Sequence, residues 1–194
     1  ASDVYKRQVH TYDKLVIAAG ARPIRPDIPG VDAEGVYYLR TVEDGIRLKH
    51  AVRAESKGRA VIVGGGFIGL EVAEEMALSG VEVHIYEMMP RLLPFLEESF
   101  SEEVLRTLEN HGVHVHLGTG VQEILTDGKT ASGVRDGNGQ EIQVDLILMS
   151  IGVMPNSELA KKAGLELGIK GGIAVNDELS LIHISEPTRL LSIS

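Results

Sequence analysis

Short apolar runs alternate with amphipathic stretches through the middle of the chain, and this alternation predicts strands and helices in turn. The predicted strands are 60–63, 82–87 and 113–117, and the predicted helices are 68–79 and 100–111. Ser99 and Glu102 have the spacing of a capping box at the start of the second helix. The order strand, helix, strand, helix, strand predicts an α/β fold with a parallel sheet and right-handed crossovers.

The second half of the chain has a different rhythm. Strand-like segments at 121–125, 131–135 and 141–151 are separated by Asp-Gly and Asn-Gly sequences, which are typical of hairpin turns. We therefore predict an antiparallel β-meander whose last strand rejoins the parallel sheet. A short helix at 157–163 and a brief strand at 173–175 are predicted to follow.

The first part of the chain has its own strand and helix signals. The apolar run 13–20 ends in glycine and predicts a strand buried on both faces. The proline-rich segment 22–30 is predicted to be an extended, stiff connector. Thr41 is the candidate N-cap of a helix over 41–53, whose first turn carries acidic side chains.

Composition and charge then narrow the function classes. The chain has 19 Lys and Arg residues against 28 Asp and Glu residues, and its net charge of −9 argues against nucleic acid or an anionic membrane as the main partner. No apolar stretch approaches the ~20 residues that span a bilayer, and no signal peptide is recognisable. The absence of cysteine excludes disulfides, thiolate metal sites and cysteine nucleophiles within these residues.

A glycine-rich turn between the first predicted strand and helix carries the candidate chemistry. It fits G-x-G-x-x-G, in which Gly64 permits a tight turn, the missing side chain of Gly66 lets a pyrophosphate approach the backbone, and Gly69 lets the helix pack closely on the strand. The N–H groups and positive dipole end of the helix would then face the phosphates. The candidate cofactor-binding residues of this turn are Gly64, Gly65, Gly66, Phe67, Ile68 and Gly69.

An acidic residue at the end of the second strand favours dinucleotide binding over a turn that only packs a helix on a strand. Glu87 lies about 20 residues beyond the turn, where a carboxylate can accept hydrogen bonds from the adenosine ribose hydroxyls. Its negative charge would repel the 2′-phosphate of NADP, so NAD(H) is favoured. Arg91 tempers this preference, because its side chain either reaches a phosphate or is a solvated loop charge.

Three further features have two interpretations each. Glu71, which we place in the first turn of the phosphate-facing helix, either complements the helix dipole or contacts a ligand. Phe67 is either a core aromatic or an exposed ring near the cofactor. His111, His114 and His116 run across a helix end into a strand, so only the last two share a face. We therefore expect a structural role for these histidines and no metal site.

Taken together, the motifs resemble those of a known family. Segments 12–23, 28–30, 64–71 and 150–156, with Glu87 among them, occur in the order seen in FAD-dependent pyridine nucleotide-disulfide oxidoreductases. The nearest resemblance is to the branch that contains coenzyme A-disulfide reductase, NADH oxidase and NADH peroxidase. This resemblance extends over most of the chain.

The resemblance implies a division of the chain into domains and adds roles for particular residues. An NAD(H)-binding domain over 51–149 would be flanked by partial FAD-binding segments at 9–50 and 150–179. Phe67 would lie over the flavin, and Glu71 would contact the nicotinamide ribose. The further cofactor-binding residues are Ala19, Gly20, Glu71, Glu87 and Gly152. The family's redox cysteine belongs upstream of residue 1, so the resemblance assigns no catalytic residue to this chain.

The resemblance also implies an activity. The full-length protein would pass a hydride from NADH, less readily from NADPH, to FAD and on to a disulfide, peroxide, oxygen or redox-protein acceptor, as a cytoplasmic homodimer. A cysteine-free ferredoxin-, nitrite- or rubredoxin-type reductase is the alternative enzyme, and a non-catalytic NAD(H)-binding or sensing module is the alternative from another class. Residues 1–8 and 180–194 resemble translated sequencing-adapter sequence, and we expect both ends to be non-native.

Overall fold

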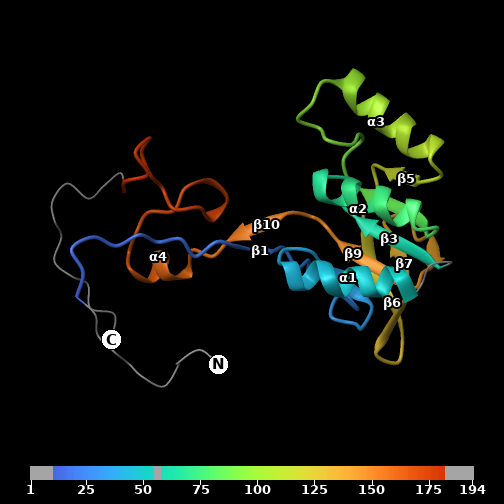
Figure 1. The fold of residues 1–194 in the computed structure, drawn as a ribbon, viewed down its shortest axis with the longest axis horizontal. Helices are drawn as coiled ribbons and strands as arrows, with labels where there is room; N and C mark the ends of the chain where they lie inside the picture. The colour runs from blue at the N-terminus through green and yellow to red at the C-terminus, as the bar shows by residue number, and fades with distance from the viewer. Residues whose placement is uncertain (1–10, 55–57, 182–194) are drawn as a thin grey trace. The chain divides into compact units, whose positions relative to one another are not determined.

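A computed structural model describes residues 11–54 and 58–181 of the chain (Figure 1). These residues belong to two compact units, one formed by 22–154 and the other by 11–21 together with 155–181. The expected non-native ends, 1–8 and 180–194, lie outside the described residues except for 180 and 181. None of the described helices is long and apolar enough to cross a membrane.

A five-stranded sheet forms the centre of unit 22–154. Its strands are β2 (Val36–Tyr38), β3 (Arg59–Val63), β4 (Glu82–Glu87), β5 (His114–Leu117) and β9 (Leu146–Met149). They lie in the order β2-β9-β3-β4-β5, and every neighbouring pair is parallel. The parallel α/β sheet expected from the alternating pattern is therefore confirmed, while edge strand β2 was not predicted.

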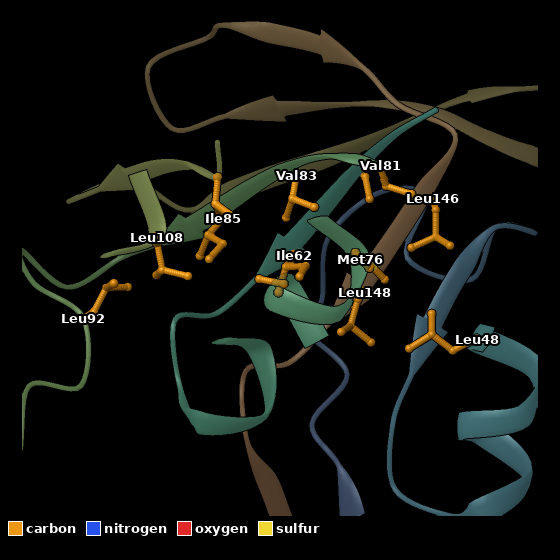
Figure 2. Close-up of a cluster of buried hydrophobic side chains, with 13 residues drawn as sticks. Leu48, Ile62, Met76, Val81, Val83, Ile85, Leu92, Leu108, Leu146 and Leu148 are labelled. Carbon is orange, nitrogen blue, oxygen red and sulfur yellow. The ribbon is translucent and has the colours of Figure 1, made fainter. Parts of the chain in front are cut away.

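Helices cover one face of this sheet and contribute to one hydrophobic cluster. They are α1 (Val42–Ala54), α2 (Phe67–Leu78) and α3 (Glu98–Asn110). Ile62, Ile85 and Leu148 project from three neighbouring strands toward Met76 of α2, as Figure 2 shows. Each of these side chains is almost fully buried, as expected for strands of a parallel sheet covered on both faces.

The opposite face of the sheet is covered by an antiparallel meander. It consists of β6 (Val121–Asp127), β7 (Thr130–Asp136) and β8 (Glu141–Gln143). Because side chains alternate along a strand, Val61 and Ile147 point to this second face and pack in a cluster with Ile124 and Val134. After β8 the chain enters β9, which pairs with β3, so the predicted meander and the return of the chain to the parallel sheet are confirmed. The single strand predicted over 141–151 is divided, because β8 and β9 belong to different sheets.

The helix starts test the predicted caps. Thr41 Oγ1 accepts a hydrogen bond from the Asp44 N–H at 3.2 Å, and Asp44 Oδ2 accepts one from the Thr41 N–H at 2.9 Å, so the predicted cap of α1 is confirmed. The capping box predicted for α3 is wrong. Glu97 is its N-cap and makes no side-chain capping bond, and Ser99 lies inside the helix, which begins earlier than the apolar pattern indicated.

The second unit contains little regular structure. The strand predicted at 13–20 is absent, and most of its apolar side chains are exposed, Val16 by 85%. Such a run forms a strand only when neighbouring strands accept its backbone hydrogen bonds, and no described strand pairs with it. The strand predicted at 173–175 is reduced to isolated bridges. The described elements here are α4 (Glu158–Lys162) and a 3₁₀ turn at Ile169–Gly171. The short strands β1 (Ala21–Pro23) and β10 (Val153–Pro155), which pair with each other, lie mostly in unit 22–154.

Candidate functional site

The glycine-rich turn joins β3 to α2 through backbone positions that exclude larger residues. Gly64 has φ +107°, which side-chain-bearing residues rarely adopt, and a Cβ there would lie 2.4 Å from the Ser150 carbonyl oxygen. A Cβ on Gly69 would lie 2.3 Å from the Gly64 carbonyl oxygen. The tight turn and the close packing of helix on strand, which were predicted for these two positions, are thus what the structure shows.

Gly66 is different, because its surroundings are open. Its φ is −83°, an ordinary value, and a Cβ built there would meet nothing within 4 Å. The residue lines a cavity instead of packing against protein. The missing side chain therefore leaves space in front of the backbone, as the approach of a phosphate group requires.

The N-terminus of α2 opens at this turn without a capping side chain. Gly66 is the N-cap and has no side chain to accept a hydrogen bond from the first turn, which contains no acidic residue either. The first N–H groups of a helix lack intrahelical partners and carry the positive end of its dipole. This end of α2 is therefore available to an anion, and a phosphate is the group that such helix ends hold in dinucleotide-binding folds.

Glu87 stands opposite this helix end, at the carboxyl end of β4. Its Oε2 accepts a hydrogen bond from the Gly65 N–H at 2.7 Å, and its Oε1 accepts one from the Met89 N–H at 2.8 Å. The carboxylate thus ties the turn to the segment after β4. Each oxygen retains a second lone pair, so both can still accept a hydrogen bond from a ligand hydroxyl.

These elements enclose a cavity of about 630 Å³ within unit 22–154. Its volume lies in the range typical of small-molecule sites. The predicted site residues that line it are Gly64, Gly66, Phe67, Ile68, Glu87 and Gly152. Among its described lining residues Glu87 is the only charged one, so the negative charge in this space comes from that carboxylate.

Two exposed aromatic rings stand at the cavity. Phe67 and Phe95 have ring centroids 5.3 Å apart in a tilted arrangement, and they are 59% and 65% exposed. The choice between a core aromatic and an exposed ring is thereby decided for Phe67 in favour of the exposed ring. Phe95 was not predicted, because it lies in the irregular segment between β4 and α3, where no periodic pattern assigns a direction to a side chain.

Another group that the sequence analysis missed is the Tyr86 phenol. Tyr86 precedes Glu87 on β4, is 4% exposed and lines the same cavity. Burial raises the pKa of its hydroxyl, and the nearby Asp136 carboxylate acts in the same direction. The phenol therefore remains uncharged at neutral pH and adds no negative charge to that of Glu87.

The remaining predicted residues lie elsewhere. Glu71 is exposed in the second turn of α2, so placing it in the first turn was wrong, because the helix begins at Phe67. Arg91 donates a hydrogen bond to the Pro94 carbonyl at 2.8 Å and is not among the residues that line the cavity. Ala19 and Gly20 belong to the other unit, where their carbonyl oxygens accept hydrogen bonds from Asn156.

The described residues fit NAD(H) better than they fit FAD. A strand, a glycine turn, an uncapped helix end and a carboxylate meet at one cavity, which suits a dinucleotide with a ribose hydroxyl pair. Gly64 to Gly69 is the one turn of this kind among the residues that the structure describes. No FAD phosphate site is therefore identified in them.

The fold and this site define a Rossmann-type dinucleotide-binding domain, carried here by unit 22–154. A comparison with protein families narrows the class. The model of the pyridine nucleotide-disulphide oxidoreductases matches residues 2–184 of the chain. The chain belongs to this family, and the resemblance seen in its motifs is confirmed.

The names of individual relatives state several different activities. The chain is 39% identical over 169 residues to an NADH oxidase of Methanocaldococcus jannaschii, covering 87% of this chain and 37% of that protein. It is 36% identical over 168 residues to the nitrite reductase (NADH) large subunit of Escherichia coli, covering 86% and 20%. The crystal structure of reduced Bacillus anthracis CoADR-RHD superimposes with a TM-score of 0.79 at 37% identity, covering 87% of this chain and 30% of that chain.

The chain therefore spans between a fifth and two fifths of the length of these relatives. The matches cover 86–87% of this chain at 36–39% identity, while the names of the relatives differ.

Proposed function

We propose that unit 22–154 binds NAD(H) in the cavity between α2, the carboxyl end of β4 and the segment after β9. The observation that carries this proposal is the uncapped N-terminus of α2, which opens beside Gly66 into the cavity. The pyrophosphate would lie against the N–H groups of that first turn, and the adenosine ribose would donate hydrogen bonds to Glu87. Phe67 and Gly152 would border the nicotinamide end.

The charge of the cavity supports NADH over NADPH. A 2′-phosphate on the adenosine ribose would lie near the Glu87 carboxylate, and two negative charges at such a distance repel each other. The described lining residues include no Lys or Arg to offset this repulsion. The names of two relatives, an NADH oxidase and a nitrite reductase (NADH) subunit, point the same way.

For the full-length protein we propose an NADH-dependent flavoprotein oxidoreductase. NADH supplies a hydride when it is bound, and in the family that the chain belongs to the first acceptor would be FAD. The chain's own residues would hold the nicotinamide in position. The relatives carry different acceptors in their names, so the proposal covers the oxidation of NADH and leaves the acceptor open. It extends to a cytoplasmic homodimer, which the family resemblance implies.

Calorimetric titrations of the purified chain with NADH and with NADPH test the cofactor site. We expect Glu87→Ala to weaken NADH binding more than NADPH binding, because it removes both the ribose acceptor and the repulsive charge. The matched control is Glu74→Ala, which removes an exposed acid of α2 that does not line the cavity. Equal losses for both cofactors in Glu87→Ala would contradict the ribose role.

Absorbance spectra separate an oxidoreductase from a simple binding module. For the chain as it stands we expect NADH binding without bound flavin and without turnover. For a longer protein that includes the flanking regions of its relatives, we expect stoichiometric flavin that NADH bleaches. A longer protein that binds NADH and no flavin would be a binding module, and the proposed oxidoreductase activity would then be wrong.

A further inference from the structure

A cluster of imidazole and carboxylate groups lies on β4 and β5, away from the dinucleotide cavity. Val83 and Ile85 point into the helix-covered core, as Figure 2 shows. Glu82 and His84 alternate with them and therefore occupy the other face of β4. In the parallel register His84 lies opposite His114, so the two strands bring three potential ligand groups together.

We propose that Glu82, His84 and His114 form a binding site for a divalent transition-metal cation of the Zn²⁺ type. One ligand atom from each of the three residues lies within 4.8 Å of the other two. Two imidazole nitrogens and one carboxylate oxygen are a ligand set that Zn²⁺ accepts, with its remaining position open to water. A bound Zn²⁺ holds such atoms about 3.3 Å apart. The exposed side chains of Glu82 and His114 can close this difference by small rotations.

The contacts of His84 prepare it as a ligand. Its ring is buried, with 8% exposed, and Nε2 lies 3.0 Å from Glu82 Oε1. Its other nitrogen, Nδ1, lies 3.1 Å from His116 Nε2. A cation between Nε2 and the Glu82 oxygen would take the place of the proton that joins these two atoms in the hydrogen bond, and Nδ1–H would then donate to His116. His116 then acts as the outer partner that fixes the ring orientation of a metal-bound histidine.

Arg59 is the competitor for this site. Its Nε and one terminal nitrogen donate to the two oxygens of Glu82 at 2.9 and 3.0 Å. A metal ion must share the carboxylate with this guanidinium or displace it from Oε1. The sequence pattern that predicted no metal site contained His111, His114 and His116 alone, because only the pairing of β4 with β5 adds His84 and Glu82.

Calorimetric titration of the untagged 194-residue chain with Zn²⁺ tests the proposal. We expect one ion to bind per chain and the affinity to fall about tenfold or more in His114→Ala and in Glu82→Gln. Both side chains are exposed, so these variants keep the core intact. The matched control is His50→Ala, which removes an exposed histidine of α1 and is expected to leave Zn²⁺ affinity unchanged.

Arg59→Gln sharpens the test, because it removes the competing cation and is expected to tighten Zn²⁺ binding. No saturable binding by the unaltered chain would overturn the proposal. Equal affinities for His114→Ala and His50→Ala would overturn it as well. NADH affinity is expected to be the same in His114→Ala and the unaltered chain, so this result is independent of the proposed dinucleotide site.

Discussion

Two apolar segments of similar composition differ in structure, because one is a buried strand and the other is an exposed segment without a strand. Residues 146–149 form β9, where Ile147 and Leu148 are fully buried between two parallel neighbours. Residues 15–19 form no strand, and Leu15 is 59% exposed. The difference lies in the neighbours, because β9 finds β2 on one side and β3 on the other. An apolar run is stabilised by the strands and side chains that cover it.

The largest difference in stability is expected when a leucine is replaced by alanine in each of the two segments. Leu148→Ala should lower the free energy of unfolding by about 2–5 kcal/mol, because it leaves a cavity in a packed core. Leu15→Ala should change it by less than about 0.5 kcal/mol, because the side chain is already exposed. Urea unfolding followed by circular dichroism measures both. A similar loss in the two variants would show that residues 15–19 are buried in solution.

Two glycines of the turn can be compared in the same way, with a smaller expected change in stability. Gly69→Ala should destabilise unit 22–154 by about 1–3 kcal/mol, because the added methyl group meets the Gly64 carbonyl oxygen. Gly66→Ala should leave stability nearly unchanged and weaken NADH binding, since its methyl group projects into open space beside the cavity. Unfolding and NADH titration of both variants check this. Tight NADH binding by Gly66→Ala would contradict the proposed path of the pyrophosphate.

The N-caps of two helices, one in each unit, can be compared in the same way. Thr41→Ala should cost about 1 kcal/mol, because it removes the hydroxyl that accepts the Asp44 N–H. Ser157→Ala at the start of α4 should cost much less, because Ser157 makes no capping hydrogen bond there. Urea midpoints of the two variants test this difference. A larger loss for Ser157→Ala than for Thr41→Ala would reverse the expected order.

The smallest expected effect is a dependence of the stability of unit 22–154 on pH. Burial lowers the pKa values of His84 and His116 below the usual 6.5. The unfolded chain then binds more protons than the folded one in the window below pH 6.5, so stability should fall as the pH drops through the lowered values. The ionised Glu82 carboxylate stabilises the folded chain over a lower pH range. Its pKa of about 2 means that this stabilisation is lost only as the pH falls from 4.5 toward 2.

Urea midpoints at pH 7.5 and at about pH 5.5 measure this dependence. The groups that face the two imidazoles are Glu82, Arg59, His114 and Asp136. His116→Gln should flatten the pH profile, whereas His50→Gln on the exposed face of α1 should leave it unchanged. A profile that stays equally steep in both variants would show that the acid sensitivity has another source.

Much of the dinucleotide site was predictable because its signals are local. Gly64, Gly66 and Gly69 follow a strand and start a helix, and each position has a steric requirement that a few neighbouring residues reveal. Glu87 was found because the end of the next strand lies at a predictable distance along the chain. Phe95 and Tyr86 were missed, since their positions at the cavity depend on an irregular segment and on the packing of the meander.

From β3 to β7, the order of strands and helices, the glycine turn and the acid at the end of β4 were determined by the sequence alone, because periodicity and turn chemistry act over a few residues. The tertiary structure decided three things that no local pattern contains. It left most of residues 15–19 exposed, it exposed the ring of Phe67, and it paired His84 with His114. Each depends on contacts between segments far apart in the chain, and such contacts exist only once the sheet has formed.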